Sequence, residues 1–125
     1  MSLINDYRKG WALRYLREAR AELTAAKKIP YMASSLILEA MKKAQAAVNY
    51  SLGDPASVEA IVYQTMIKKK SPEEPVLRCL VEIERMVEQI AMAPELEREK
   101  ALEQADELIH IASDIVKLFV GEEID

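Results

Sequence analysis

The stretch "WALRYLREARAELTAAKKIPYMASSLILEAMKKAQAA", residues 11–47, decides the fold because it contains two helical stripes separated by a proline turn. In its first half, small and aliphatic residues recur alternately four and three positions apart, which places them on one face of a helix. These residues are Ala12, Leu16, Ala19, Leu23 and Ala26. After Pro30 a similar stripe follows, small enough to let a neighbouring helix come close: Ala33, Ile37, Ala40, Ala44 and Ala47. The stretch therefore predicts two packed helices.

Prolines and glycines divide the whole chain into five helical segments. The first is expected from Asn5 to Lys28, and the second from Pro30 to Gly53, where a left-handed C-terminal conformation is expected. Asp54-Pro55 has the pattern of an N-cap and first helical residue of a shorter third segment, which stops at residues 68–70.

The last two helices follow from proline positions. Pro75 disfavours the helical region for the residue before it, so the fourth helix is expected to start there and not at Pro72. Pro94 separates it from a fifth helix that ends at Gly121. Inward-facing residues are expected at Ile4, Tyr7, Trp11 and Tyr15, at Val58, Ile61, Val62 and Met66, at Val76, Leu80, Ile83, Val87 and Ile90, and at Leu102, Ala105, Ile109, Ala112, Val116 and Phe119. The predicted fold class is all-α, with residues 1–125 forming a single domain: an up-and-down antiparallel bundle of four long helices plus one shorter helix.

Composition limits the compartment and the chemistry. Cys79 is the single cysteine, which excludes an intrachain disulfide, a paired-cysteine zinc site and a Cys-x-x-Cys redox motif. No apolar run approaches the roughly 18 residues of a membrane helix, and the N-terminal residues carry charge, so a cytoplasmic protein without a membrane segment is expected. Asparagine occurs only at positions 5 and 49 while Glu, Lys and Arg dominate the polar residues, a bias found in thermophilic proteins.

Charge is unevenly distributed along the chain. Residues 1–70 contain 12 Lys or Arg and 6 Asp or Glu, whereas residues 71–125 contain 5 and 15. One interpretation is that the first two helices pack beside the last two and pair charges along their edges. The other is that the basic part binds an anionic partner such as RNA. This candidate surface comprises Arg8, Lys9, Arg14, Arg17, Arg20, Lys27 and Lys28.

The single histidine, His110, forms with Glu107 a Glu-x-x-His pair whose spacing can direct two ligands at one metal ion. A di-iron bundle needs a second such pair, which one chain with one histidine lacks. Glu103 and Asp106 could form one carboxylate pair of a helical nucleotide pyrophosphohydrolase, but no Glu-x-x-Glu pair precedes them. Nothing places His110 beside Cys79, and the three glycines stand too far apart for a phosphate-binding loop. No catalytic residue, metal ligand or cofactor is therefore predicted, and a non-enzymatic role is favoured.

Residues 11–47 also resemble the opening of HEPN domains, small helical bundles named for nucleotide binding in higher eukaryotes and prokaryotes. The matching positions are Trp11, Leu13, Ala19, Leu23, Ala25 and Ala26, then Tyr31, Ala33 and the run from Glu39 to Ala44. The segment "ADELIHIASDIVKLFV", residues 105–120, is similar to the closing helix of that family. The resemblance implies an up-and-down bundle, commonly a homodimer, that often pairs with a small nucleotidyltransferase in toxin–antitoxin systems.

Many HEPN domains are metal-independent ribonucleases that use an arginine followed by four to six residues and a histidine. Counting back from His110, the arginine would stand at one of three positions that here hold Glu103, Gln104 and Ala105. The cleavage chemistry then lacks the cation that would stabilise phosphorane charge. We therefore expect a non-catalytic interaction module that self-associates and pairs with a nucleotidyltransferase-type partner. An RNA-binding or degenerate ribonuclease domain is the first alternative, and a carboxylate- or metal-dependent bundle enzyme is the second.

Glu39 lies between Leu38 and Ala40 on the second helix, among apolar or small residues. This placement predicts a partly buried carboxylate that pairs with Arg14 or Arg17 of the first helix.

Overall fold

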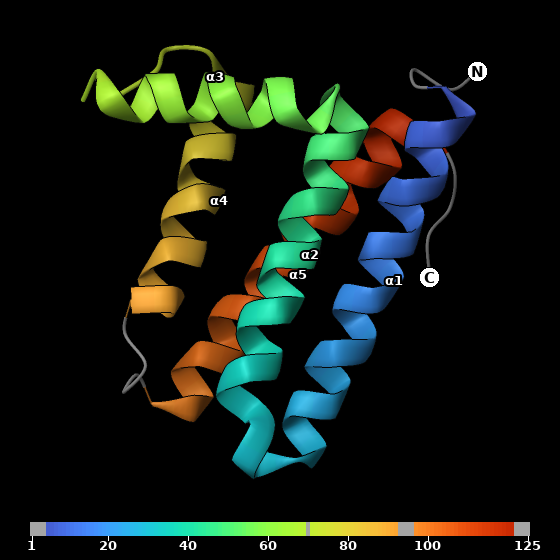
Figure 1. The fold of residues 1–125 in the computed structure, drawn as a ribbon, viewed down its shortest axis with the longest axis vertical. Coiled ribbons are helices and arrows are strands. Elements are labelled where there is room, and N and C mark those ends of the chain that lie inside the picture. The colour runs from blue at the N-terminus through green and yellow to red at the C-terminus, as the bar shows by residue number, and fades with distance from the viewer. Residues whose placement is uncertain (1–4, 70, 93–96, 122–125) are drawn as a thin grey trace.

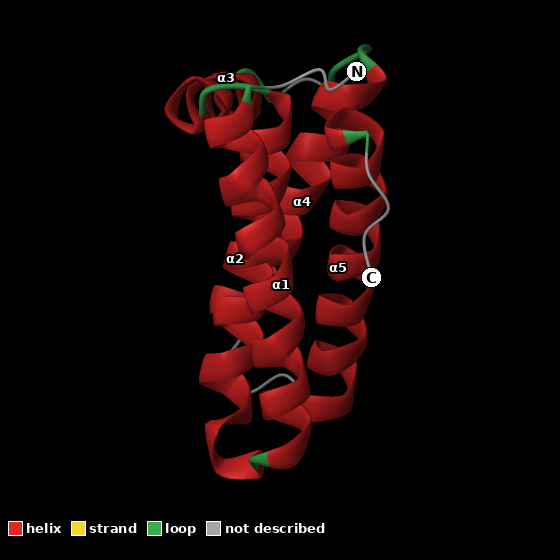
Figure 2. Ribbon diagram, turned by 90° about the vertical axis from the view of Figure 1, so that its right-hand side faces the viewer, coloured by secondary structure: helices red, strands yellow, loops and turns green. Residues whose placement is uncertain are grey.

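The computed structural model describes residues 5–69, 71–92 and 97–121, and every secondary-structure element in these ranges is helical (Figure 2). The predicted all-α class is therefore confirmed for the described residues. Ile4, Lys70 and Pro94, which the sequence interpretation used, lie outside them. The elements are α1 (Asp6–Lys28), the short 3-10 helix η1 (Pro30–Met32), α2 (Ala33–Leu52), α3 (Pro55–Ile67), α4 (Pro75–Met92) and α5 (Arg98–Val120).

Three helices form the main body of the molecule. α1 and α2 run antiparallel and side by side, and α5 packs against both of them (Figure 1). α3 lies across one end of this group, and α4 starts beneath the middle of α3 and runs back toward the opposite end of the molecule (Figure 1). The four long helices α1, α2, α4 and α5 thus alternate in direction along the chain. α3 and α4 pack against α2 less extensively than α1 and α5 do.

Alanine dominates the core between α1, α2 and α5. All ten stripe residues predicted for the first two helices are buried, and Ala105 and Ala112 of α5 are fully buried as well. Because an alanine side chain projects little from its helix, neighbouring backbones can approach closely. Larger side chains with no exposed surface, Leu16, Met41 and Leu108, fill the space that remains. The stripe residues within 11–47 are therefore buried between helices, as their spacing predicts.

Two acidic side chains begin helices at the predicted places. The Asp54 carboxylate accepts a hydrogen bond from the backbone N–H of Ser57 at 3.2 Å, and α3 starts at Pro55. The Glu74 carboxylate accepts the backbone N–H of Leu77 at 2.7 Å, and α4 starts at the residue that follows Glu74. These caps satisfy N–H groups that the first turn of a helix leaves without partners.

The ends of α2 differ from expectation. Its expected start at Pro30 is a 3-10 turn, and α-helical bonding begins at Ala33. The left-handed conformation expected at Gly53 is wrong: its φ is 177°, which is extended backbone that leads straight into the next N-cap. The glycine instead leaves room for α3, since a Cβ at Gly53 would lie 3.3 Å from Cγ2 of Val58. Gly121, which ends α5 as predicted, does have a left-handed φ of 75°.

Three residues predicted to face inward are exposed: Tyr7 (68%), Ile61 (52%) and Val76 (44%). Tyr7 and Val76 lie in the first turns of α1 and α4, where fewer neighbouring helices cover the surface. Ile61 is exposed because α3 packs against the core through Val58, Val62 and Met66, which leaves part of its apolar surface without a neighbour among the described residues. Periodicity identifies apolar residues, but it does not tell how many sides of a helix the fold covers.

Candidate functional site

A groove of about 470 Å³ opens between α2, α3 and α4. Its largely apolar wall consists of Val62, Tyr63, Met66 and Ile67 from α3 and of Leu80 and Ile83 from α4. The groove follows from the crosswise placement of α3, whose N-cap comes directly after the end of α2 and which leads the chain away before α4 returns (Figure 1). Its size falls within the range of small-molecule sites.

Three carboxylates line this groove, Glu59 from α3 and Glu84 and Glu88 from α4. Gln45 of α2 donates a hydrogen bond from Nε2 to Oε1 of Glu84 at 2.7 Å. Burial raises the pKa of Glu84; the Gln45 hydrogen bond opposes this shift, and the neighbouring carboxylates of Glu88 and Glu59 add to it. The lining residues include no lysine or arginine, so the groove carries uncompensated negative charge.

Asn49 of α2 is the second polar feature of the groove. The residue is only 5% exposed, and its side chain lines the groove. Its backbone carbonyl accepts the N–H of Gly53 at 3.1 Å, but within the described residues its side-chain amide makes no hydrogen bond. What remains exposed of this largely buried residue therefore lies at the groove, where its amide is free to bond a ligand.

Replacing Glu84 with glutamine is expected to stabilise the protein at neutral pH by about 0.3 kcal/mol, the size of a like-charge pair one turn apart on a helix. The folded state raises the pKa of Glu84, so folding disfavours its charged form, and stability falls as pH rises from the unfolded pKa through the folded one. The gain should therefore be full at about pH 7 and vanish in acid below the unfolded pKa, at about pH 3.

Urea unfolding of both proteins at the two pH values measures this difference. Glu82→Gln is the control, since Glu82 is an exposed carboxylate of the same helix that pairs with Arg85 at 3.4 Å. An equal gain from both substitutions would contradict the assignment to the groove.

A second groove, also about 470 Å³, lies between α1 and α5 and is polar. Arg20 donates from Nη2 to Oγ of Ser113 at 2.9 Å, while its Nη1 is buried without a hydrogen-bond partner in the described part of the chain. Lys27, His110 and Asp114 line the same groove. It therefore mixes both signs of charge.

His110 is on the solvent side of α5, with a side chain that is 78% exposed. Its Nδ1 lies 3.0 Å from the backbone carbonyl oxygen of Asp106, one turn earlier. Glu103 and Glu107 are also exposed. Across residues 5–69, 71–92 and 97–121, no three His, Cys, Asp or Glu side chains gather into a group that could hold a metal ion.

Three arginines of the predicted basic surface are engaged by the protein itself. Arg8 donates from Nε to the carbonyl of Tyr50 at 3.0 Å and from Nη2 to that of Ser51 at 3.2 Å, which satisfies carbonyls at the end of α2. Arg14 pairs with a neighbouring glutamate and lies over the Trp11 ring, and Arg20 bonds α5 as described above. The remaining surface residues are half-buried Lys9 and exposed Arg17, Lys27 and Lys28. The seven residues therefore do not form one free cationic patch.

The expected pairing of a basic and an acidic half takes another form. With Lys9 left aside, the ion pairs among the described residues join partners of the same half. The halves are linked instead by hydrogen bonds, such as the one from Gln45 to Glu84 and the one from Arg98 Nη2 to the carbonyl of Lys27 at 3.0 Å, which helps to cap α1.

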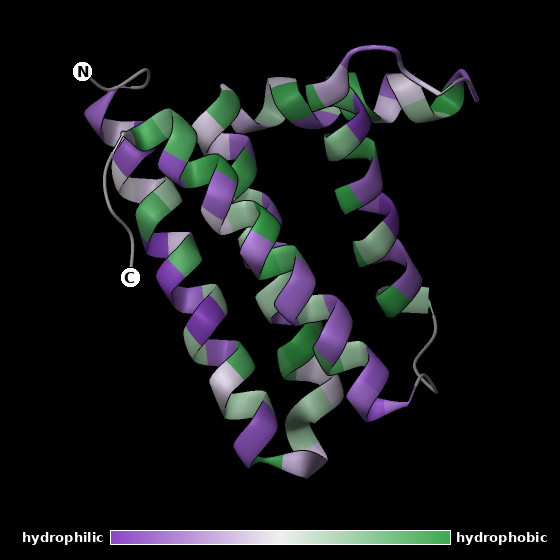
Figure 3. Cartoon of the chain, turned by 180° about the vertical axis from the view of Figure 1, so that it is seen from behind, coloured by the Kyte–Doolittle hydropathy of each residue, from purple (hydrophilic) through white to green (hydrophobic). Residues whose placement is uncertain are grey.

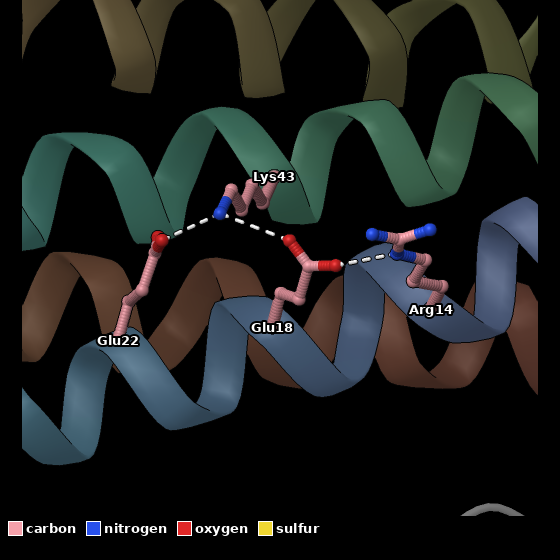
Figure 4. Close-up of polar contacts among 4 residues, drawn as sticks. All are labelled: Arg14, Glu18, Glu22 and Lys43. Carbon is pink, nitrogen blue, oxygen red and sulfur yellow. Dashed lines mark hydrogen bonds and ion pairs between the residues drawn. The ribbon is translucent and has the colours of Figure 1, made fainter.

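Lys43 of α2 joins the first two helices by contacting two carboxylates of α1 (Figure 4). Its Nζ lies 3.0 Å from Oε1 of Glu18 and also bonds Glu22, and these hydrogen bonds raise the pKa of the ammonium group. Glu18 in turn accepts from Nε of Arg14 at 2.8 Å, the first of the contacts that lower its pKa. Glu39 is exposed, so its predicted role was wrong. Lys43, one turn after Glu39 on α2, is the charged residue that contacts α1.

Cys79 is half-buried beside the core. Burial raises the pKa of its thiol, and the Glu82 carboxylate adds to this effect. The thiol therefore stays protonated at neutral pH and is a poor nucleophile.

Sequence reasoning missed the groove between α2, α3 and α4 as a site. Its signals were present: Glu84 and Glu88 stand one turn apart beside an apolar stripe, and Asn49 interrupts the run of buried residues that ends α2. These signals become a site only when α3 turns across α2 and brings Glu59 to them.

Comparison with protein-family models, with curated proteins and with solved structures found no match. Within the described ranges, no helix combines the length and the apolar character that crossing a membrane requires.

Proposed function

We propose that the chain is a non-catalytic, HEPN-like interaction module that self-associates, with α3 as its contact surface. The observation that carries this proposal is the outer face of α3. Thirteen residues long, α3 contains a single charged residue, Glu59, although most of its surface is exposed. Surface helices ordinarily place charged residues opposite their buried stripe. Green residues recur along α3 in Figure 3, which colours the chain by hydropathy.

The exposed face of α3 has a pattern that suits a second copy of itself. Ala56, Ala60, Tyr63 and Ile67 follow one another at spacings of four, three and four, so they share one side of the helix, and all are exposed. If two α3 helices pack antiparallel, Ala56 faces Ile67 of the partner subunit and Ala60 faces the partner's Tyr63. Large residues then meet small ones throughout, which is the self-complementarity that a two-fold interface needs.

Light scattering after gel filtration tests the proposal. The wild-type protein should elute with twice the mass of the 14.1 kDa chain, and Ile67→Glu should raise the dimer dissociation constant on the order of 100-fold, because a carboxylate would be buried without a partner. Leu118→Glu is the matched control, since Leu118 is an equally apolar residue, 71% exposed on α5. A wild-type monomer at micromolar concentration, or equal effects of the two substitutions, would overturn the proposal.

The HEPN-like assignment itself rests on the resemblance of residues 11–47 and 105–120, and the alternating directions of the four long helices support the up-and-down bundle that it implies. The partner suggested by the resemblance is a small nucleotidyltransferase. A nucleotidyltransferase reading frame beside this one would support the pairing, and co-purification of the two proteins would test it directly.

RNA binding is the second candidate function. Arg17, Lys27 and Lys28 remain exposed on α1 and support it, whereas the contacts of Arg8, Arg14 and Arg20 leave fewer cations for phosphate. Titration of labelled RNA at two salt concentrations separates the candidates, because binding through phosphate contacts weakens steeply as salt rises.

A further inference from the structure

The groove between α2, α3 and α4 has features that its own fold does not use. Three carboxylates, Glu59, Glu84 and Glu88, line it without a basic residue among the lining side chains. Glu84 and Glu88 are one turn apart on α4, where like charges repel each other. Glu84 is partly buried, while Glu59 and Glu88 are exposed, and partly buried charges in folded proteins are usually paired with an opposite charge. A cation in the groove would supply that pairing.

Asn49 is an independent indication of a ligand. Its side chain is buried, lines the groove and has no hydrogen-bond partner among the described residues. The amide can both donate and accept, so it can bind a ligand N–H with its oxygen. A largely buried polar side chain that bonds no other described residue and borders an open groove is suited to bonding a ligand there.

The remaining wall is largely apolar, formed by Val62, Tyr63, Met66 and Ile67 of α3 and by Leu80 and Ile83 of α4. A hydrated metal ion or a polyamine would leave this surface in contact with water. A neutral apolar molecule would cover it but would also remove water from the carboxylates, which is unfavourable without a counter-charge. Anions, including nucleic acid phosphates, are repelled. The combination matches a molecule with a charged nitrogen on an apolar body.

We propose that this groove binds an amphiphilic organic cation, with its ammonium group between Glu84 and Glu88 and its apolar body against α3 and α4. Asn49 accepts a hydrogen bond from the bound nitrogen or from a polar substituent next to it. Tyr63 and Ile67 line this groove and also belong to the α3 face proposed for self-association, so the two proposals share part of one surface. The carboxylates and Asn49, which carry the cation proposal, lie outside that face, and ligand binding is measured independently of the oligomeric state.

Octylammonium is the probe, and isothermal titration calorimetry at neutral pH measures its binding. The neutral analogue octanol and the anionic analogue octanoate share its apolar body. We expect saturable binding of octylammonium, at least about tenfold tighter than that of octanol, and no binding of octanoate, since a tenfold ratio corresponds to 1.4 kcal/mol. Absence of octylammonium binding, or octanol binding of equal strength, would overturn the proposal.

Substitutions locate the site. Glu84→Gln and Glu88→Gln keep the side-chain shape and should each weaken octylammonium binding at least about threefold, a loss of about 0.7 kcal/mol, and Asn49→Ala should weaken it too. Glu88 is exposed, so its substitution does not endanger folding. Glu82→Gln on the same helix should leave binding unchanged, because Glu82 does not line the groove. Equal weakening by Glu82→Gln would show attraction to the acidic surface in general and would refute the site.

Discussion

Replacing Leu108 with alanine is expected to lower the free energy of unfolding by about 3 kcal/mol. Leu108 has no exposed surface and lies on α5, the helix that packs against both α1 and α2. Its loss removes apolar contacts and leaves a cavity. Because the surrounding helices meet through alanines, whose side chains are too short to extend into the space, the core can relax only partly. Urea unfolding followed by circular dichroism measures the change.

Leu118→Ala on the same helix is the control for this substitution. The chemistry is identical, but Leu118 is 71% exposed, so the free energy of unfolding should change by no more than about 0.5 kcal/mol. Similar losses from both substitutions would mean that α5 does not pack against α1 and α2 through the face that contains Leu108.

Replacing Ala19 with leucine is expected to destabilise the protein by about 2 kcal/mol for the opposite reason, because it adds volume where helices meet closely. Ala19 is 0% exposed within the stripe that α1 buries. A leucine there must separate α1 from its neighbours or adopt a strained rotamer, and both disturb several buried contacts at once. The measurement is again the unfolding free energy, with the slope against urea recorded to detect any change in compactness.

Ala21→Leu serves as the matched control, two residues further along α1. Ala21 is exposed, so the larger side chain extends into water and stability should stay within about 0.5 kcal/mol of the wild type. If Ala19→Leu left the free energy of unfolding unchanged, close packing through the alanine stripe would be refuted.

Much of the fold could be predicted from the sequence because the deciding signals are local. Alternating spacings of four and three residues place alanines on one side of a helix wherever that helix packs, and Asp54 and Pro75 mark helix starts through the chemistry of the first turn. The all-α class follows from these features. Tyr7, Ile61 and Val76 were misplaced because their exposure depends on where neighbouring helices end, which is a property of the assembled molecule.

The candidate sites could likewise be predicted from the sequence only in part. The sequence groups Arg8, Arg14 and Arg20 in one basic surface, but the Tyr50 carbonyl bonded by Arg8 and the Ser113 hydroxyl bonded by Arg20 lie 42 and 93 residues away along the chain. Likewise, Glu59 belongs with Glu84 only because α3 crosses α2. Charged residues can be counted in a sequence, but the sequence does not show which of them the fold brings into contact with an opposite charge.

The order of the core helices along the chain determines which of them can pack together during synthesis. α1 and α2 are neighbours in sequence, so their hairpin can form on the ribosome as soon as residues up to Leu52 have emerged. The third core helix, α5, is synthesised only after α3 and α4. Until then, the apolar faces of α1 and α2 that α5 covers stay open to water, so a chain that ends before α5 exposes apolar surface that the full fold buries.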